Sequence, residues 1–468
     1  MPKFLLAFFL AVSALFFSAP SFAQDSEMGL AKLSAADEKR YREILENPID
    51  ENQLNLKKID AYKEKEHAFT MLGADKGREE NLIAWSKIDP DGKWSLRAYW
   101  GVMGKYEDAI RIGNEIINES KFPPSSARIR LYMAVDYLQT NQIDKAKELL
   151  DKAESIIKYD FGRVPRNGGT IIWIVRAETE FYAYKSVYLS RIGKAEEALT
   201  MARLALEKSK ELLKLIPNIP SELFRTFART TVARTAGNIV NQQISSGQFI
   251  SAQWSLRDAL KVAKENGFNE SHMFLFHLMT SDIMGGMGEF GQALQYAEKS
   301  EKSFLNQGFQ KSSVNWMRSK SRELTALAGL NEWSKALTVL QDAYGETKGT
   351  LYEPKNTING KLIGLIQIKN NRIDDAISVL SEAFKNDSTN YGPKHYYTAI
   401  SQGLLGVAYW KKGDLAKART ELESARTVIN SPDSLSGDFS ESAIQRKTNR
   451  FIFESYMQML AQTAQNNA

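Results

Sequence analysis

The chain has no cysteine among its 468 residues and only four histidines. Disulfide bonds, cysteine-ligated metal sites and a lipid anchor on an N-terminal cysteine are therefore excluded. Beyond the N-terminus, no apolar run approaches the roughly 20 residues that cross a bilayer. The longest candidate, residues 399–410, ends at Lys411. We also find no stretch in which polar and apolar residues alternate as in a β-strand. These absences predict a helical protein that is stabilised by packing alone.

The N-terminus has the pattern of a secretory signal. Lys3 supplies a positive start, residues 4–17 are almost entirely apolar, and residues 21–23 (Ser-Phe-Ala) place small residues at both positions that determine cleavage. The apolar stretch is shorter than a membrane span, which argues against an uncleaved anchor. We therefore expect residues 1–23 to be a signal peptide that is removed after Ala23. The mature chain is expected to be periplasmic, with secretion as the alternative.

The charge balance is close to neutral for a chain of this length. Lysine and arginine total 61, aspartate and glutamate total 56, and the net charge is +5 with both signs interspersed. Such a surface lacks the basic patch that binds nucleic acid, so no nucleic-acid partner is expected. A single hydrophobic core rarely exceeds about 250–300 residues, so the chain must form several domains or a stacked array of repeats.

A repeated pattern occupies most of the chain. Each copy has Gly or Asn at a turn, an apolar residue two positions later and alanine five positions after the turn. The last copy is the most complete, with Leu405, Gly406, Tyr409, Gly413, Leu415, Ala418, Leu422 and Ala425. The turn, apolar and alanine positions recur as Gly104/Tyr106/Ala109, Asn141/Ile143/Ala146, Gly193/Ala195/Ala198, Gly247/Phe249/Ala252, Gly288/Phe290/Ala293, Asn331/Trp333/Ala336 and Asn371/Ile373/Ala376. A second small residue follows seven positions later at Ala153, Ala205, Ala259, Ser300, Ala343, Ala383 and Ala425, whereas the first copy has Ile116.

Helix packing explains this spacing. Glycine or asparagine at the turn can adopt the left-handed conformation that ends a first helix. The apolar residue two positions later packs the start of a second helix against the first. Alanines one and two turns further on let the two helices approach closely, so that the ridges of one settle into the grooves of the other. No single pair buries its apolar face alone, so neighbouring pairs must stack.

In these residues the chain resembles the tetratricopeptide-repeat family. The resemblance implies an all-α fold, an α-solenoid of antiparallel helix pairs wound into a right-handed superhelix. Successive alanines are mostly about 40 residues apart, rather than the 34 of the short family consensus, and this resembles the longer-helix variety in the maltose-regulon activator. Two intervals are longer still, 52 residues from Ala146 to Ala198 and 54 from Ala198 to Ala252. Additional loop or helix is expected there, at 159–170 and 216–222.

The pattern divides the mature chain into three parts. Residues 24–90 match it poorly and are expected to form N-terminal helices that act as a degenerate capping unit, beginning with a capping box at Ser34. Residues 91–430 are expected to hold about eight helix pairs. Residues 431–468 are expected to form a C-terminal capping helix and tail. In that helix, the residues expected to cover the last pair are Ile444, Phe451, Tyr456 and Leu460.

Motifs for cofactor or metal binding are weak. The spacing Gly286-x-Gly288-x-x-Gly291 matches the dinucleotide fingerprint, but that motif requires a preceding strand, and Gly288 already serves as a turn residue of the repeat. His272 and His277 are five residues apart, so they do not share one face of a helix as a zinc-binding pair does. No cofactor and no metal are therefore expected.

Catalytic motifs are equally weak. Helical enzymes that cleave peptidoglycan have a catalytic glutamate followed by serine. Glu-Ser occurs here at Glu119, Glu154, Glu270, Glu423, Glu441 and Glu454, and in no case does the Gly-Leu-Met-Gln stretch of those enzymes follow. There is also no nucleophile elbow, no phosphate-binding loop and no HExxH motif. We expect the protein not to be an enzyme.

The family resemblance also implies where a partner would bind. The concave face is lined by certain positions of each first helix, which here carry Arg128, Arg191, Arg234, Asn241, Arg318, Lys361, Lys369 and Lys411. The acidic residues at such positions are Asp91, Glu180 and Asp282. This slight excess of cations favours a partner with carboxylate groups, because arginine pairs readily with carboxylate. An ordinary solvated helix face is the alternative interpretation.

The functional expectation is a periplasmic adaptor or scaffold that binds a protein or peptide segment of the cell envelope without catalysis. The first alternative is a sensor input module that docks onto a membrane signalling protein. The second is a helical enzyme that cleaves peptidoglycan.

Overall fold

The computed structural model describes residues 35–466 with short gaps, at 51, 73–76, 104, 141, 168, 219–221, 267–272, 306–310, 312–313, 350–352 and 432–441. All regular structure in this part of the chain is helical, and none of it is β-strand. The expected all-α solenoid is confirmed. Three helices precede the repeats: α3 (Ala35–Glu46), α4 (Asn55–Leu72) and α5 (Arg78–Ser86). Ser34, the expected start of the capping box, lies outside the described residues.

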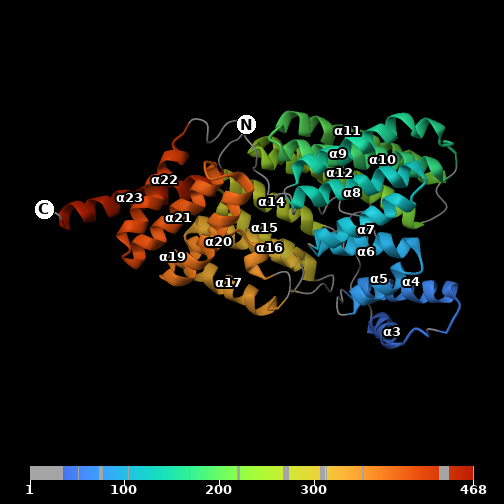
Figure 1. Cartoon of the computed structure of the whole chain (residues 1–468), viewed down its shortest axis with the longest axis horizontal. Coiled ribbons are helices and arrows are strands. Elements are labelled where there is room, and N and C mark those ends of the chain that lie inside the picture. The colour runs from blue at the N-terminus through green and yellow to red at the C-terminus, as the bar shows by residue number, and fades with distance from the viewer. Residues whose placement is uncertain are drawn as a thin grey trace.

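Between Pro90 and Ile429 the helices follow one another as antiparallel pairs (Figure 1). The pairs are α6 (Pro90–Val102) with α7 (Tyr106–Glu119), α8 (Pro123–Gln139) with α9 (Ile143–Tyr159), α10 (Thr170–Arg191) with α11 (Ala195–Leu215), α12 (Glu222–Ser245) with α13 (Phe249–Glu265), α14 (Phe274–Met287) with α15 (Phe290–Leu305), α16 (Val314–Leu330) with α17 (Trp333–Glu346), α19 (Gly360–Lys369) with α20 (Ile373–Tyr391), and α21 (Tyr396–Lys412) with α22 (Leu415–Ile429). A one-turn helix, α18 (Pro354–Thr357), precedes α19, and α23 (Ala443–Asn466) follows the last pair.

The turn residues adopt the left-handed conformation that the repeat pattern predicts. Positive φ angles occur at Gly193 (79°), Gly247 (74°), Gly288 (94°), Asn331 (62°), Asn371 (58°) and Gly413 (91°). Asparagine tolerates this region because its short amide bonds locally, and glycine because it has no Cβ. The other two expected turn residues, Gly104 and Asn141, lie outside the described residues.

The alanine positions are the contact points within each pair. The alanine five positions after the turn is at most 2% exposed in every pair: Ala109, Ala146, Ala198, Ala252, Ala293, Ala336, Ala376 and Ala418. At the second small position most residues are equally buried, although Ala383 is only half-buried. Close helix crossing therefore explains why these positions are small.

The two long intervals are filled mainly by longer helices. α10, α11 and α12 have 22, 21 and 24 residues, compared with 14 to 17 in the two pairs α14–α17. Short 3₁₀ turns at Phe161–Arg163 and Ile216–Asn218 account for the rest. The third and fourth pairs are thus taller than the others.

The solenoid winds tightly enough for distant pairs to meet. Met103, just after α6, packs against the cluster that contains Phe274 of α14 and Trp316 of α16. Figure 1 shows α6 and α7 beside α16, although four pairs separate them along the chain. The end of α6 in the first pair therefore packs against helices of the fifth and sixth pairs.

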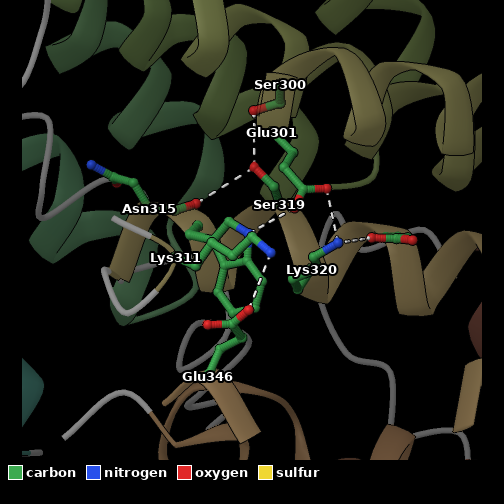
Figure 2. A network of polar contacts seen from close by, with 9 residues as sticks. Ser300, Glu301, Lys311, Asn315, Ser319, Lys320 and Glu346 are labelled. Carbon is green, nitrogen blue, oxygen red and sulfur yellow. Dashed lines mark hydrogen bonds and ion pairs between the residues drawn. The ribbon is translucent and has the colours of Figure 1, made fainter. Parts of the chain in front are cut away.

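A polar network joins the fifth and sixth pairs (Figure 2). Ser300 occupies the second small position, and its hydroxyl donates to the carbonyl oxygen of Phe274 at 2.9 Å. The hydroxyl of Ser319 donates to Ser300 Oγ at 3.1 Å, and Lys320 Nζ donates to Glu301 Oε2 at 2.8 Å. Serine rather than alanine at this position therefore adds hydrogen bonds without adding bulk.

The C-terminal helix α23 contacts more than the last pair. Tyr456 is buried, and Phe451 and Leu460 pack against the core of the last two pairs, as expected. Ile444 instead reaches a cavity deeper in the solenoid. α23 also contacts α14 and α16, which belong to the fifth and sixth pairs. A helix expected only as an end cap therefore also lies along the inner wall.

Candidate functional site

Arg128 was expected on the concave face, but its guanidinium is buried inside the chain. Its side chain is 4% exposed, and Nε donates to Glu180 Oε2 at 2.7 Å. The Arg176 side chain pairs with the other oxygen of the same carboxylate, at 3.0 Å. Burial raises the pKa of Glu180, but the two arginines outweigh it and bring that pKa below its usual value. Arg128 therefore already has a carboxylate partner, and it joins α8 to α10.

Three more of the expected groove residues are buried. Arg191 is 4% exposed, Asn241 6% and Arg318 6%. One guanidinium nitrogen of Arg318 donates to Asn315 Oδ1 at 3.0 Å. Burial lowers the pKa of Arg191, and the nearby Tyr391 of α20 opposes this effect. The close approach of distant pairs explains this burial, which periodicity within one pair cannot reveal.

The remaining four expected residues are more accessible. Arg234 is half-buried on α12. Lys361 Nζ pairs with Asp387 at 2.7 Å. Lys369 Nζ lies 3.6 Å from the ring centroid of Phe451 on α23, and burial together with Lys411 lowers its pKa. Lys411 is exposed above the ring of Trp410. Of the eight expected residues, only Lys361 lines the cavity described next.

A cavity of about 450 Å³ lies between the last five pairs and α23, and we call it the inner cavity. Its walls come from α12, α14, α16, α19, α20, α21 and α23, together with the first residues of α13 and the α18 segment. Ile244, Phe249, Ile358, Leu365 and Ile400 supply apolar surface. Segments far apart in the sequence thus line one shared cavity.

Two ion pairs line the inner cavity. Arg322 of α16 makes three hydrogen bonds to the carboxylate of Asp282 on α14, at 3.0, 3.3 and 2.9 Å. Burial raises the pKa of Asp282, and Arg322 opposes this. The second pair is Lys361 with Asp387, whose carboxylate also accepts a hydrogen bond from the hydroxyl of Ser401. Both pairs fix charged groups at the wall and leave it without a large net charge.

Aromatic side chains form another part of the wall. Tyr391 lies 5.9 Å from Tyr397, measured between ring centroids, and His395 stacks on Tyr391 at 5.1 Å. Lys361 Nζ lies 5.4 Å from the ring centroid of Tyr397. Asn449 of α23 donates to the hydroxyl of Tyr396 at 2.7 Å. Such flat, rigid surfaces with polar edges suit contact with side chains of a bound segment.

None of the described glutamates of the Glu-Ser pairs lines the inner cavity. Of the Glu-Ser glutamates, Glu119, Glu154, Glu423 and Glu454 lie among the described residues, and their side chains are about half exposed and paired with lysine or arginine outside the cavity. Glu270 and Glu441 lie outside the described residues.

The described residues contain neither a metal-ligand cluster nor a membrane-spanning helix. Within the described ranges, no three His, Asp or Glu side chains gather as metal ligands. In the same part of the chain, no helix is both long and apolar enough to cross a membrane. Gly288 ends α14 with a left-handed φ angle, as expected of a turn residue rather than of a phosphate loop. His277 lies beside Tyr296, and His272, the other histidine of this pair, lies outside the described residues.

Comparison with known proteins identifies the repeat. A sequence profile of the tetratricopeptide repeat matches residues 356–431, which include the last two pairs. No curated protein sequence matches the chain. The apo form of the quorum sensor NprR from B. thuringiensis is 13% identical, with 80% of this chain and 97% of that chain covered and a TM-score of 0.47. A Rap protein complexed with competence and sporulation factor is 11% identical, with coverage of 85% and 99% and a TM-score of 0.47. These likenesses extend to the helical-repeat fold alone.

Proposed function

Because the chain is a tetratricopeptide-repeat protein, a scaffold of the kind that binds other proteins, we propose that it is a non-catalytic adaptor of the bacterial cell envelope. A short segment of another protein would occupy the inner cavity. The envelope location is supported by the signal pattern of residues 1–23 alone.

The inner cavity is the observation that carries the proposal. Its volume of about 450 Å³ falls within the roughly 300–1,000 Å³ typical of ligand pockets. That space accommodates a few side chains rather than a folded domain. The bound group is therefore expected to be a terminus or an extended segment of a partner.

The side chains that line the inner cavity indicate which kind of segment would bind there. Asp282 with Arg322 and Lys361 with Asp387 already neutralise each other, so a strongly charged ligand would leave one of its charges without a partner. Apolar and aromatic side chains make up much of the remaining wall. A segment with apolar or aromatic side chains and a hydrogen-bonding backbone fits this surface best. This differs from the acidic partner expected from the sequence.

The proposal is tested by filling the cavity mouth. Asn386 of α20 is exposed and lines the inner cavity, so Asn386→Trp should obstruct the cavity without disturbing the core. Affinity purification from envelope extracts with the unaltered chain should recover a specific protein. We expect Asn386→Trp to lose that protein.

Lys385→Trp is the matched control, because Lys385 is exposed on the same helix but does not line the cavity. This variant should retain the partner. Equal recovery with both variants would show that the partner binds elsewhere. Reversing the charge of Arg318 is a poor alternative test, since this side chain is buried and its loss would perturb folding first.

A further inference from the structure

Residues on one face of α23 contact three successive pairs at the ends of their first helices. Ala443 lies beside Gly288, where a Cβ built on the glycine would be 3.4 Å from the Cβ of Ala443. Lys447 Nζ donates to the carbonyl oxygen of Gly329. Phe451 lies under Lys369, with 3.6 Å between Nζ and the ring centroid. The three α23 residues are spaced i, i+4 and i+8, which places them on one face of the helix.

The contacted surface has a distinct chemistry. Gly288, Gly329 and Lys369 mark the C-terminal ends of α14, α16 and α19, and we call this surface the helix-end strip. Carbonyl groups in the last turn of a helix have no partner within that helix, and they carry the negative end of its dipole. Lys447 supplies a cation and a hydrogen bond at this place, and its Nζ also lies 4.9 Å from the ring centroid of Phe290. The helix-end strip therefore favours a cation at Gly329 and an aromatic ring at Lys369.

The N-terminal half of α23 fits this preference. It carries Arg446, Lys447 and Arg450, with Glu454 as the first acidic residue. Arg450 points away from the strip, since its side chain is 80% exposed and pairs with Glu454. The small, basic and aromatic residues Ala443, Lys447 and Phe451 are thus the ones that face the strip.

We propose that the helix-end strip is a docking site for a basic amphipathic helix, that α23 is its resident occupant, and that a helix supplied in trans with the same three residues displaces it. Residues of α23 also line the inner cavity, so displacement removes one wall of that cavity. The inference goes beyond the proposed function, because the helix-end strip is occupied whether or not the cavity binds a segment.

The test uses the full chain and a fluorescent synthetic peptide with the sequence of residues 443–466. Lys447→Glu combined with Phe451→Ala in the chain should weaken the resident helix. We expect that variant to bind the peptide at least tenfold more tightly than the unaltered chain does, as measured by fluorescence anisotropy. A peptide that carries the same two substitutions should not bind. Arg450→Glu in the chain changes the same charge on the outward face and should leave peptide binding unaltered.

A disulfide lock provides an independent measurement. The chain has no cysteine, so Gly288→Cys with Ala443→Cys introduces one bond only, and the Cβ separation at this pair suits a disulfide. The oxidised form should exclude the peptide, and reduction should restore the binding. The reduced form also controls for strain at position 288.

Three outcomes would overturn the proposal. The oxidised and reduced forms could bind the peptide equally, or the substituted peptide could bind as well as the unaltered one. The oxidised chain could also migrate as a covalent dimer, which would assign α23 to a neighbouring copy. None of these results depends on recovery of an envelope partner, so failure here is distinguishable from failure of the proposed function.

Discussion

Arg128 Nε and Glu180 Oε2 lie 2.7 Å apart, although the two residues are separated by 52 positions in the sequence. Arg176 approaches the same carboxylate from one turn earlier on α10. The rings of Trp94, Tyr132 and Trp173 surround the guanidinium of Arg128 at 5.1 to 5.6 Å. The carboxylate of Glu180 therefore contacts two buried cations, one in the second pair and one in the third.

Removal of that carboxylate charge should destabilise the fold. Glu180→Gln keeps the shape but removes the carboxylate charge that is paired with the buried guanidinium of Arg128, and breaking such a pair costs about 3–5 kcal/mol. Urea unfolding followed by circular dichroism would measure the loss. Lys147→Ala, which removes the exposed ion pair with Asp151, should leave the unfolding curve unchanged. Similar small effects from both variants would contradict the role assigned to Glu180.

Stability should depend on the protonation of Asp136. Burial raises the pKa of this carboxyl to about 6, against the opposing effect of Arg97. Arg97 donates to Asp136, and Tyr106 also faces it. Because the folded-state pKa lies above the unfolded value, the folded chain binds the additional proton. The stability that this bound proton gives to the folded chain is fully present below about pH 4 and is lost as the pH rises through about 6.

Asp136→Asn removes this titration, so the unfolding free energies of the unaltered chain and the variant should be compared between pH 4 and pH 8. The difference between them should change most steeply between about pH 4 and pH 6 and level off above about pH 6, with the unaltered chain losing stability relative to the variant as the pH rises. A constant difference, or an inflection below pH 4, would show that the pKa is not raised.

Gly286 and Gly291 of the glycine-rich motif should respond in opposite ways to alanine. A Cβ on Gly286 would lie 2.2 Å from the ring of Phe249, whereas a Cβ on Gly291 meets nothing within 4 Å. Overpacking makes Gly286→Ala destabilising by about 1–3 kcal/mol, and Gly291→Ala should be neutral or stabilising by up to about 1 kcal/mol. Thermal unfolding would measure both effects, and Phe249→Leu should recover part of the first. Equal effects would indicate that helix contact does not explain Gly286.

Export predicts a mature chain that begins at Gln24. Mass spectrometry of the protein purified from a periplasmic fraction should find the chain without residues 1–23, and Ala23→Trp should retain them, because a large residue blocks the cleavage position. Detection of the intact N-terminus on the unaltered protein in the cytoplasmic fraction would contradict export.

Local features of the repeat could be predicted from the sequence because they depend on residues only a few positions apart. Asn371 ends a helix two residues before Ile373, and Ala376 faces the first helix of the same pair, so the spacing alone predicts both conformation and burial. The extra length of the third and fourth pairs was also visible, as long intervals between alanines. The sequence did not show that this extra length takes the form of helices with more than 20 residues.

The candidate site was largely hidden from the sequence. Arg318 and Lys361 both occupy positions that line the concave face in the family, yet one is buried and the other lines the inner cavity. Their difference arises from what the superhelix brings against them. The cavity residues Arg322, Asp387 and Tyr391 gave no sequence signal, since each is an ordinary helical residue until another pair approaches it.

The sequence by itself determined that the chain forms paired helices, where each pair turns and which small residues lie between its two helices, because these properties follow from contacts over one or two helical turns. Only the tertiary structure decided which face of the solenoid remains accessible. The curvature that brings Met103 to the cluster around Phe274 and Trp316 and lays α23 across α14 and α16 is the sum of many small angles between successive pairs. No local pattern in the sequence predicts this total curvature.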